Sequence, residues 1–112
     1  MADCIFCKIV HKEIQTELIH ESEGFIVIKD ISPQAPVHLL IISKEHIPSL
    51  DELEPRHQQL VGAMVLQAKE LAAVFGLPSG YRLVVNCGPD GGQVVPHLHI
   101  HMLGGQKIAG LV

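Results

Sequence analysis

The sequence is poor in large aromatic side chains, with no tryptophan, one tyrosine and three phenylalanines among 112 residues. Hydrophobic residues nevertheless make up 47% of the chain and charged residues only 18%, so a core can be buried and disorder is not expected. Because aromatic residues are so few, that core must be aliphatic. The length suits one compact domain over residues 1–112 and leaves no room for a second.

Two further absences exclude classes of function. No long hydrophobic run occurs, and charged residues such as Asp3, Lys8 and Glu13 interrupt the start of the chain. We therefore expect no signal peptide and no membrane partner, and we predict a cytoplasmic location. An excess of positive charge is also missing, since the formal charge is −4 with histidine neutral, and this argues against a nucleic-acid partner. The three cysteines cannot all pair, so thiols or metal ligands are favoured over disulfides.

Turn signals and apolar patterning predict an α+β domain. A short helix is expected over 4–13, and a long one over 55–75 has proline at its start and Gly76 at its end. Strands are expected at 18–21, 25–29, 37–42, 81–86 and 97–103, with a hairpin turn at 22–24, a loop at 31–36 and a glycine-rich turn at 88–92. Five strands with short links indicate an antiparallel sheet. Apolar residues cover two adjacent faces of the long helix, so it is either sandwiched within the domain or meets another subunit.

Histidine, by contrast, is unexpectedly frequent. Three of the eight histidines alternate with aliphatic residues in His97-Leu98-His99-Ile100-His101-Met102. In a strand, alternate residues share a face at intervals of roughly 6.6 Å, so the three imidazoles are predicted to line one face. A merely exposed face would not need histidine, and a three-histidine metal site is awkward when the outer two lie about 13 Å apart. Imidazole is a nucleophile that also carries protons near neutral pH, which favours catalysis.

The stretch from Asp90 to Gly105, Asp-Gly-Gly-Gln-Val-Val-Pro-His-Leu-His-Ile-His-Met-Leu-Gly-Gly, resembles the signature of the histidine triad (HIT) family, Hint branch. Similar segments occur in the expected order at 5–9, 30–38, 44–47 and 80–86, so the resemblance spans nearly the whole chain. It implies a HIT-like fold, with a five-stranded antiparallel sheet, one long helix and one short helix. It also implies a homodimer in which two such sheets become continuous.

The resemblance further implies an activity. Hint-like enzymes hydrolyse purine nucleoside 5′-phosphoramidates, in which an amine is linked to AMP or GMP, through a nucleotidyl-histidine and without a cofactor for catalysis. The nucleophile position falls on His99, and His101 matches the residue that contacts the phosphate and the leaving group. His97 and His38 match residues that support the orientation of the nucleophile.

The resemblance also implies which residues contact the nucleotide. Asp30 matches the residue that binds the ribose hydroxyls, although a turn residue before the 31–36 loop would look the same. The base slot matches apolar residues that would otherwise be ordinary core: Phe6, Ile9, Ile28 and Ile31. The phosphate contacts match Gln93, the amide of Val95, Asn86, His99 and His101, of which Asn86 is equally plausible as the end of a strand. Val94 and Pro96 depart from the residues common in close relatives, which bears on the leaving group rather than on the reaction class.

The pair Cys4-Ile5-Phe6-Cys7 has the spacing with which two thiolates reach one tetrahedral metal. A redox pair or two small buried residues are the alternatives, although a redox pair is expected beside a βαβ unit that this sequence lacks nearby. HIT proteins with such a pair bind zinc through it, a histidine after the third strand and the first triad histidine. The resemblance therefore implies a structural zinc held by Cys4, Cys7, His46 and His97.

Two other functions stay open at this point. A dinucleoside polyphosphate hydrolase is the activity of a sister branch, but that branch lacks the Leu-Gly-Gly found at 103–105. A non-catalytic protein that binds a nucleotide or zinc would not need the intact histidine row.

Overall fold

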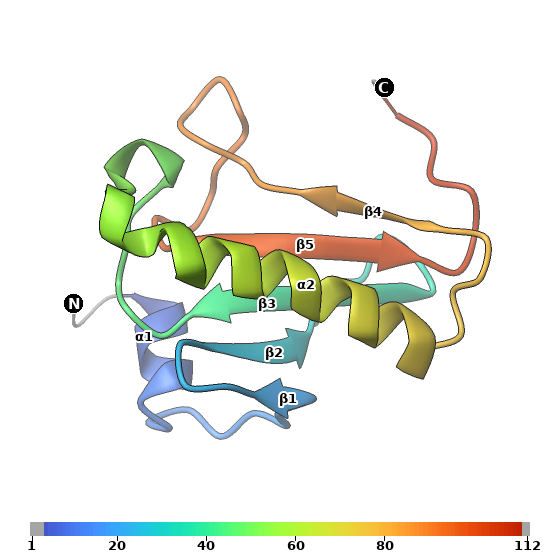
Figure 1. Cartoon of the computed structure of the whole chain (residues 1–112), viewed down its shortest axis with the longest axis horizontal. Helices are drawn as coiled ribbons and strands as arrows, with labels where there is room; N and C mark the ends of the chain where they lie inside the picture. Colours follow the sequence, from blue (N-terminus) through green and yellow to red (C-terminus); the bar gives the residue numbers. More distant parts are fainter. Residues whose placement is uncertain (1–3, 111–112) are drawn as a thin grey trace.

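The computed structural model describes residues 4–110, which form a five-stranded antiparallel sheet with two helices (Figure 1). The elements are α1 (Ile5–Val10), β1 (His20–Glu21), β2 (Phe25–Lys29), β3 (Val37–Ser43), the short 3-10 turns η1 (Leu50–Glu52) and η2 (Pro55–His57), α2 (Gln58–Val74), β4 (Tyr81–Val84) and β5 (His99–Gly104). The strand order is β1-β2-β3-β5-β4. The predicted α+β class, with one long and one short helix, is confirmed.

The central strands are buried on both faces, because helices lie on both sides of the sheet. One core lies between the sheet and α2, and its buried members include Val27, Leu39, Ile41, Met64, Ala68, Leu71, Ile100 and Met102. The second core lies between the opposite face and α1, and it includes Phe6, Cys7, Ile9, Ile26, Ile28, Leu40 and Ile42. Strand β3 reads as a nearly continuous apolar run because its alternate residues enter the two cores in turn.

Several element boundaries differ from those predicted. The first helix ends at Val10 rather than at residue 13, since Lys12 takes a left-handed conformation with φ 62°. The long helix begins as the 3-10 turn η2, and α2 itself starts at Gln58. Strands β1 and β4 are shorter than predicted, at 20–21 and 81–84.

The last strand begins at His99, two residues later than the histidine alternation predicts. The backbone turns just before it, because the His97 amide donates to the Val95 carbonyl at 2.8 Å. His97 therefore lies outside β5, and its side chain does not continue the row that His99 and His101 form. Within the ladder, His99 lies opposite Ile42 and His101 opposite Leu40, which places both rings on the α1 side of the sheet.

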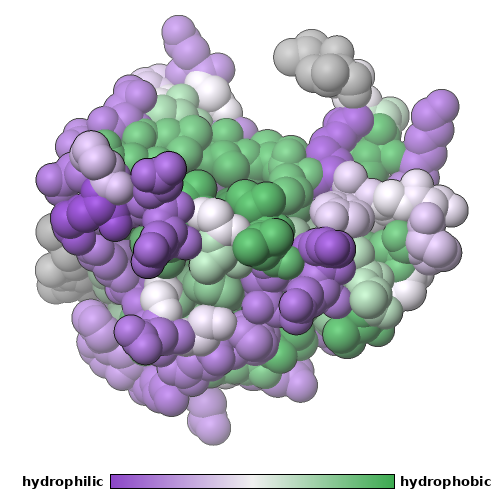
Figure 2. All heavy atoms as spheres, viewed as in Figure 1, coloured by the Kyte–Doolittle hydropathy of each residue, from purple (hydrophilic) through white to green (hydrophobic). Residues whose placement is uncertain are grey.

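The outer face of α2 carries exposed apolar residues, with Val65 45%, Leu66 66% and Val74 78% accessible. Figure 2 shows hydrophobic atoms gathered over this side of the molecule. The wide apolar surface of the long helix was expected either to be sandwiched within the domain or to meet another subunit. The structure buries one stripe of α2 inside the domain and leaves the other stripe exposed. Neither helix within residues 4–110 is long and apolar enough to cross a membrane.

Candidate functional site

His99 is held so that one ring nitrogen is a free base. Its Nδ1 lies 2.6 Å from the backbone oxygen of His97, and a carbonyl only accepts, so Nδ1 carries the hydrogen. The lone pair is therefore on Nε2. Burial lowers the pKa of His99, partly opposed by the hydrogen bond to His97, and the imidazole is neutral near pH 7. This arrangement suits a nucleophile.

A chain of hydrogen bonds holds His101 in the tautomer opposite to that of His99, with the hydrogen on Nε2. The Gln34 amide donates to His38 Nδ1 at 3.0 Å, so His38 carries its hydrogen on Nε2. That Nε2 lies 3.0 Å from His101 Nδ1, which must accept, and neutral His101 then carries its own hydrogen on Nε2. Burial, with His99 and His38 nearby, lowers the pKa of His101. His38 was expected to support the orientation of His99. The structure instead places the His38 ring in contact with His101.

Asp30 is a turn residue whose side chain also contacts His38 beside the histidine row. Its Oδ1 accepts from the Ser32 amide at 2.8 Å, while its Oδ2 lies 3.4 Å from His38 Nε2. Asp30, His38 and His101 are close enough for their side-chain atoms to share a cation. The His38 nitrogen that faces this space carries a hydrogen, however, so the three residues act as a hydrogen-bond chain rather than as a ligand set.

The apolar residues predicted for the base slot divide into two groups. Phe6 is buried on α1, and its ring meets that of His99 edge to face at a centroid distance of 4.9 Å. Ile9 and Ile28 belong to the same core as Phe6. Ile31, in contrast, is 96% exposed, so the structure does not bring it into that group.

The glycine-rich turn at 88–92 is held by two of the side chains that were predicted to contact phosphate, Gln93 and Asn86. Gln93 donates both amide hydrogens to carbonyls, of Pro48 at 2.7 Å and of Val95 at 3.1 Å, and accepts from the Gly88 amide. Asn86 donates to the Gly91 carbonyl at 2.7 Å. The Gly91 and Gly92 amides are also bonded within the turn, whereas the Val95 amide has no partner in the described part of the chain. Among the predicted phosphate contacts of the 86–95 segment, Val95 thus has a free donor.

Four residues from distant parts of the sequence form a cluster of metal-ligand type. The atoms that Cys4, Cys7, His46 and His97 offer all lie within 4.8 Å of one another. The two histidine Nδ1 atoms are 3.2 Å apart, Cys4 Sγ is 3.2 Å from His97 Nδ1, and Cys7 Sγ is 3.1 Å from His46 Nδ1. Burial, together with the Cys4 thiol, raises the pKa of Cys7 to about 11. A cation at the centre would offset this cost of holding a thiolate there.

His97 links this cluster to the histidine row. It is fully buried, and its Nε2 donates to the Ser43 carbonyl at 2.6 Å, which leaves the Nδ1 lone pair directed at the cysteines. Its own carbonyl holds His99. His97 therefore supports the orientation of His99 through its backbone rather than through its ring.

Two contributors to the site could not be found from the sequence. The Ser43 carbonyl and the Gln34 amide set the tautomers of His97 and His38, and both act through the backbone. Backbone groups leave no signal in residue identity. Elsewhere, a hollow of about 650 Å³ at the far end of β5, lined by 76–82 and 105–108, contains none of the predicted site residues.

The chain is similar to proteins described as HIT or HIT-like. Residues 3–110 match the family model for "Scavenger mRNA decapping enzyme C-term binding". The chain is 48% identical to an uncharacterized HIT-like protein of Synechococcus elongatus over 96% of this chain and 94% of that protein. It is 47% identical to Protein HitA of Neisseria gonorrhoeae, with 93% and 97% covered. A solved HIT family hydrolase from Legionella pneumophila matches with a TM-score of 0.92 and 42% identity over 96% of each chain.

Proposed function

Because this chain belongs to the HIT family and a solved relative is described as a hydrolase, we propose that it cleaves purine nucleoside 5′-phosphoramidates. The proposal rests on one observation: two adjacent imidazoles differ in whether their Nε2 atom carries a hydrogen. His99 presents an unprotonated Nε2, and His101, with its ring centroid 5.0 Å away, presents an Nε2–H. The first offers a lone pair to phosphorus, and the second offers a hydrogen to a phosphate oxygen or to the leaving nitrogen.

The proposed reaction has two steps. In the first, His99 Nε2 attacks the α-phosphorus and forms a P–N bond while the bond to the amine breaks. The amine leaves with the bonding electron pair and with a proton taken from water. In the second step water attacks the same phosphorus, the electron pair of the P–Nε2 bond returns to the imidazole, and the nucleoside monophosphate is released with a proton lost to solvent. Two easier steps replace one difficult displacement, and no cofactor takes part.

Nucleotide recognition in this proposal uses the residues around the two histidines. The base lies against Phe6 and its apolar neighbours, the ribose hydroxyls donate to the Asp30 carboxylate, and the phosphate accepts from the Val95 amide. Asn86 and Gln93 contribute by holding the turn that presents this amide. The assignment of Ile31 to the base slot stays a prediction.

We also propose that the Cys4, Cys7, His46 and His97 cluster holds a structural zinc ion. Zinc–sulfur bonds of about 2.3 Å and zinc–nitrogen bonds of about 2.0–2.1 Å in a tetrahedron place two nitrogens about 3.3 Å apart and a nitrogen and a sulfur about 3.6 Å apart. The corresponding separations here are 3.2 Å and 3.1–3.5 Å. The His97 hydrogen bond to a carbonyl is typical of metal-bound imidazoles. With four protein ligands the ion has no open position, so its contribution is to bind α1 to the histidine row.

The exposed apolar face of α2 supports a homodimer. Within residues 4–110, strand β4 lies at the edge of the sheet and pairs only with β5, and α2 carries Val65, Leu66 and Val74 on its outer side. A second copy placed on the same surfaces about a two-fold axis would pair the open edges and cover these residues.

A side-by-side assay tests the proposed activity. Purified protein and a His99→Ala variant are incubated with an adenosine 5′-phosphoramidate and with a diadenosine polyphosphate, and the products are separated by chromatography. We expect AMP and free amine from the phosphoramidate with the unmodified protein, and no turnover with the variant. Faster cleavage of the polyphosphate would assign the sister-branch activity instead, and AMP binding without turnover of either substrate would indicate a non-catalytic protein.

A further inference from the structure

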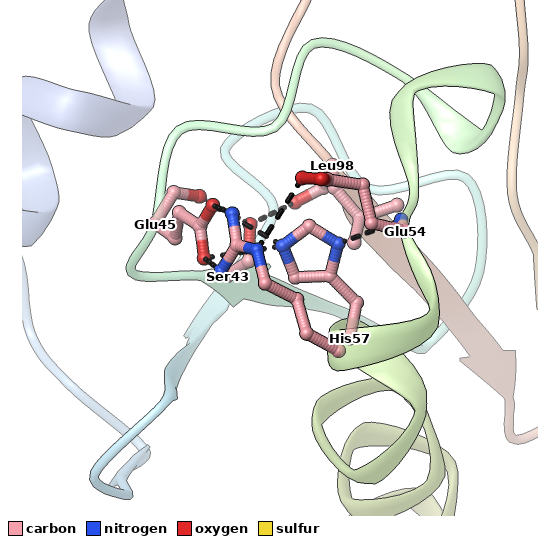
Figure 3. Close-up of polar contacts among 6 residues, drawn as sticks. Ser43, Glu45, Glu54, His57 and Leu98 are labelled. Atoms are coloured by element: carbon pink, nitrogen blue, oxygen red, sulfur yellow. Dashed lines mark hydrogen bonds and ion pairs between the residues drawn. The ribbon is translucent and has the colours of Figure 1, made fainter.

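A second buried histidine, outside the row, belongs to a polar network at the start of α2. His57 is 4% exposed, and its Nδ1 accepts from the Glu54 amide at 2.9 Å, so its hydrogen is on Nε2. That Nε2 lies 3.1 and 3.2 Å from the two carboxylate oxygens of Glu45. Figure 3 shows the His57 ring between the Glu45 side chain and the backbone of Glu54. A buried N–H without its acceptor would be costly, so this contact fixes Glu45 strongly.

The same carboxylate is held from a second direction. Arg56 places two guanidinium nitrogens at 3.1 and 2.6 Å from the oxygens of Glu45. The backbone of Glu45 is fastened as well, because the Ser43 hydroxyl donates to its carbonyl at 2.8 Å. Both the side chain and the main chain of Glu45 are therefore tied down, although the side chain is 43% exposed.

Glu45 directly precedes His46, which is the ligand of the metal cluster that packing restrains least. Cys4, the N-cap of α1, and Cys7 within α1 are both buried, and His97 is fully buried with its Nε2 bonded to a carbonyl. His46 is only half-buried, yet its Nδ1 lies within 3.2 Å of both Cys7 Sγ and His97 Nδ1. A half-buried ring needs a fixed backbone to keep this position, and the adjacent residue supplies it.

We propose that Glu45 is a positioning residue for the metal cluster: anchored by His57 and Arg56 at the start of α2, it fixes the backbone of His46 so that this imidazole meets Cys7 and His97. The inference rests on the metal binding proposed above and on no feature of the nucleotide reaction. A purely structural role for Glu45, as the acceptor of the buried His57 Nε2–H and the partner of the exposed Arg56, would lower stability equally with and without metal and would leave the metal affinity unchanged.

Cobalt(II) titration of the chelator-stripped full chain tests the proposal, because thiolate-to-cobalt charge-transfer bands report the cluster directly. We expect Glu45→Ala to weaken cobalt binding about tenfold, the lower end of the loss seen when outer-shell partners of metal ligands are removed. Glu45→Gln keeps an acceptor for the His57 Nε2–H and should restore most of the affinity. Glu70→Ala is the control, since Glu70 is exposed on α2 and its carboxylate has no contact with Glu45, His57 or Arg56 in the described residues, and it should change the affinity less than about twofold.

Thermal unfolding with and without cobalt separates positioning from general stabilisation. If Glu45→Ala lowers the melting temperature equally in both conditions and leaves cobalt affinity unchanged, the proposal is wrong. If Glu45→Ala fails to fold, Glu45→Asp replaces it, because a side chain one methylene shorter draws the carboxylate away from the His57 Nε2–H that it contacts at 3.1 and 3.2 Å. Equal affinities for the Asp and Gln variants would also overturn the idea. Absence of cobalt bands in the unmodified protein would refute the metal site itself, whereas the phosphoramidate assay would be unaffected.

Discussion

Removing the proposed zinc ion should destabilise the protein chiefly through α1. This helix has six residues, too few to be stable alone, and it is bound to the sheet by the cluster and by the packing of Phe6 and Ile9. Free zinc at about 100 times its dissociation constant stabilises the folded state by about 2.7 kcal/mol. An unfolding entropy of roughly 2.1 cal/mol/K per residue amounts to about 240 cal/mol/K for this chain, so saturation should raise the melting temperature by about 11 °C.

The measurement is a calorimetric or fluorescence melt of chelator-stripped protein over a zinc titration, with Cys7→Ser as the matched variant. Serine keeps the size and the hydrogen-bonding capacity of the buried cysteine but is a poor zinc ligand. We expect the unmodified protein to gain about 11 °C and the variant to gain almost nothing. Zinc should change kcat much less than it changes the melting temperature, since neither His99 nor His101 is among the four residues that would hold the ion. An equal gain for both proteins, or no gain for either, would refute the reasoning.

Three further outcomes are expected. His99→Ala should nearly abolish turnover while AMP affinity stays within a few-fold in calorimetry, and a variant that keeps more than about a tenth of kcat, a loss of only ~1.4 kcal/mol, would exclude His99 as the nucleophile. Asp30→Asn should raise KM about tenfold for ribonucleotide substrates and much less for 2′-deoxy substrates, and equal effects on both would remove Asp30 from ribose binding. Leu66→Glu should convert a dimer into monomers in light scattering, with Lys29→Glu on β2, far from β4 in the sheet, as control, and a monomeric unmodified protein at micromolar concentration would rule out the dimer.

Much of the architecture follows from local patterns. Two prolines exclude regular structure from 31–36, the Ser22–Gly24 turn closes a hairpin by a 2.8 Å bond from the Ser22 amide to Phe25, and proline and glycine delimit the long helical segment. Alternation also placed His99 and His101 on one face with aliphatic residues behind them. Spacing alone paired Cys4 with Cys7 on one turn of helix.

The sequence by itself thus determined which strands and helices form and which side chains are proposed to carry the chemistry, because periodicity and turn residues act over a few positions. Only the tertiary structure decided where His97 belongs: the backbone turns at 95–97, so its ring joins the cysteines while its carbonyl holds His99. The tautomer of His101 was likewise set by groups distant in the sequence, and the anchoring of Glu45 on His57 joins two elements that no local pattern relates. A proton's place on an imidazole depends on the donor or acceptor opposite it, and the fold supplies that partner from elsewhere in the chain.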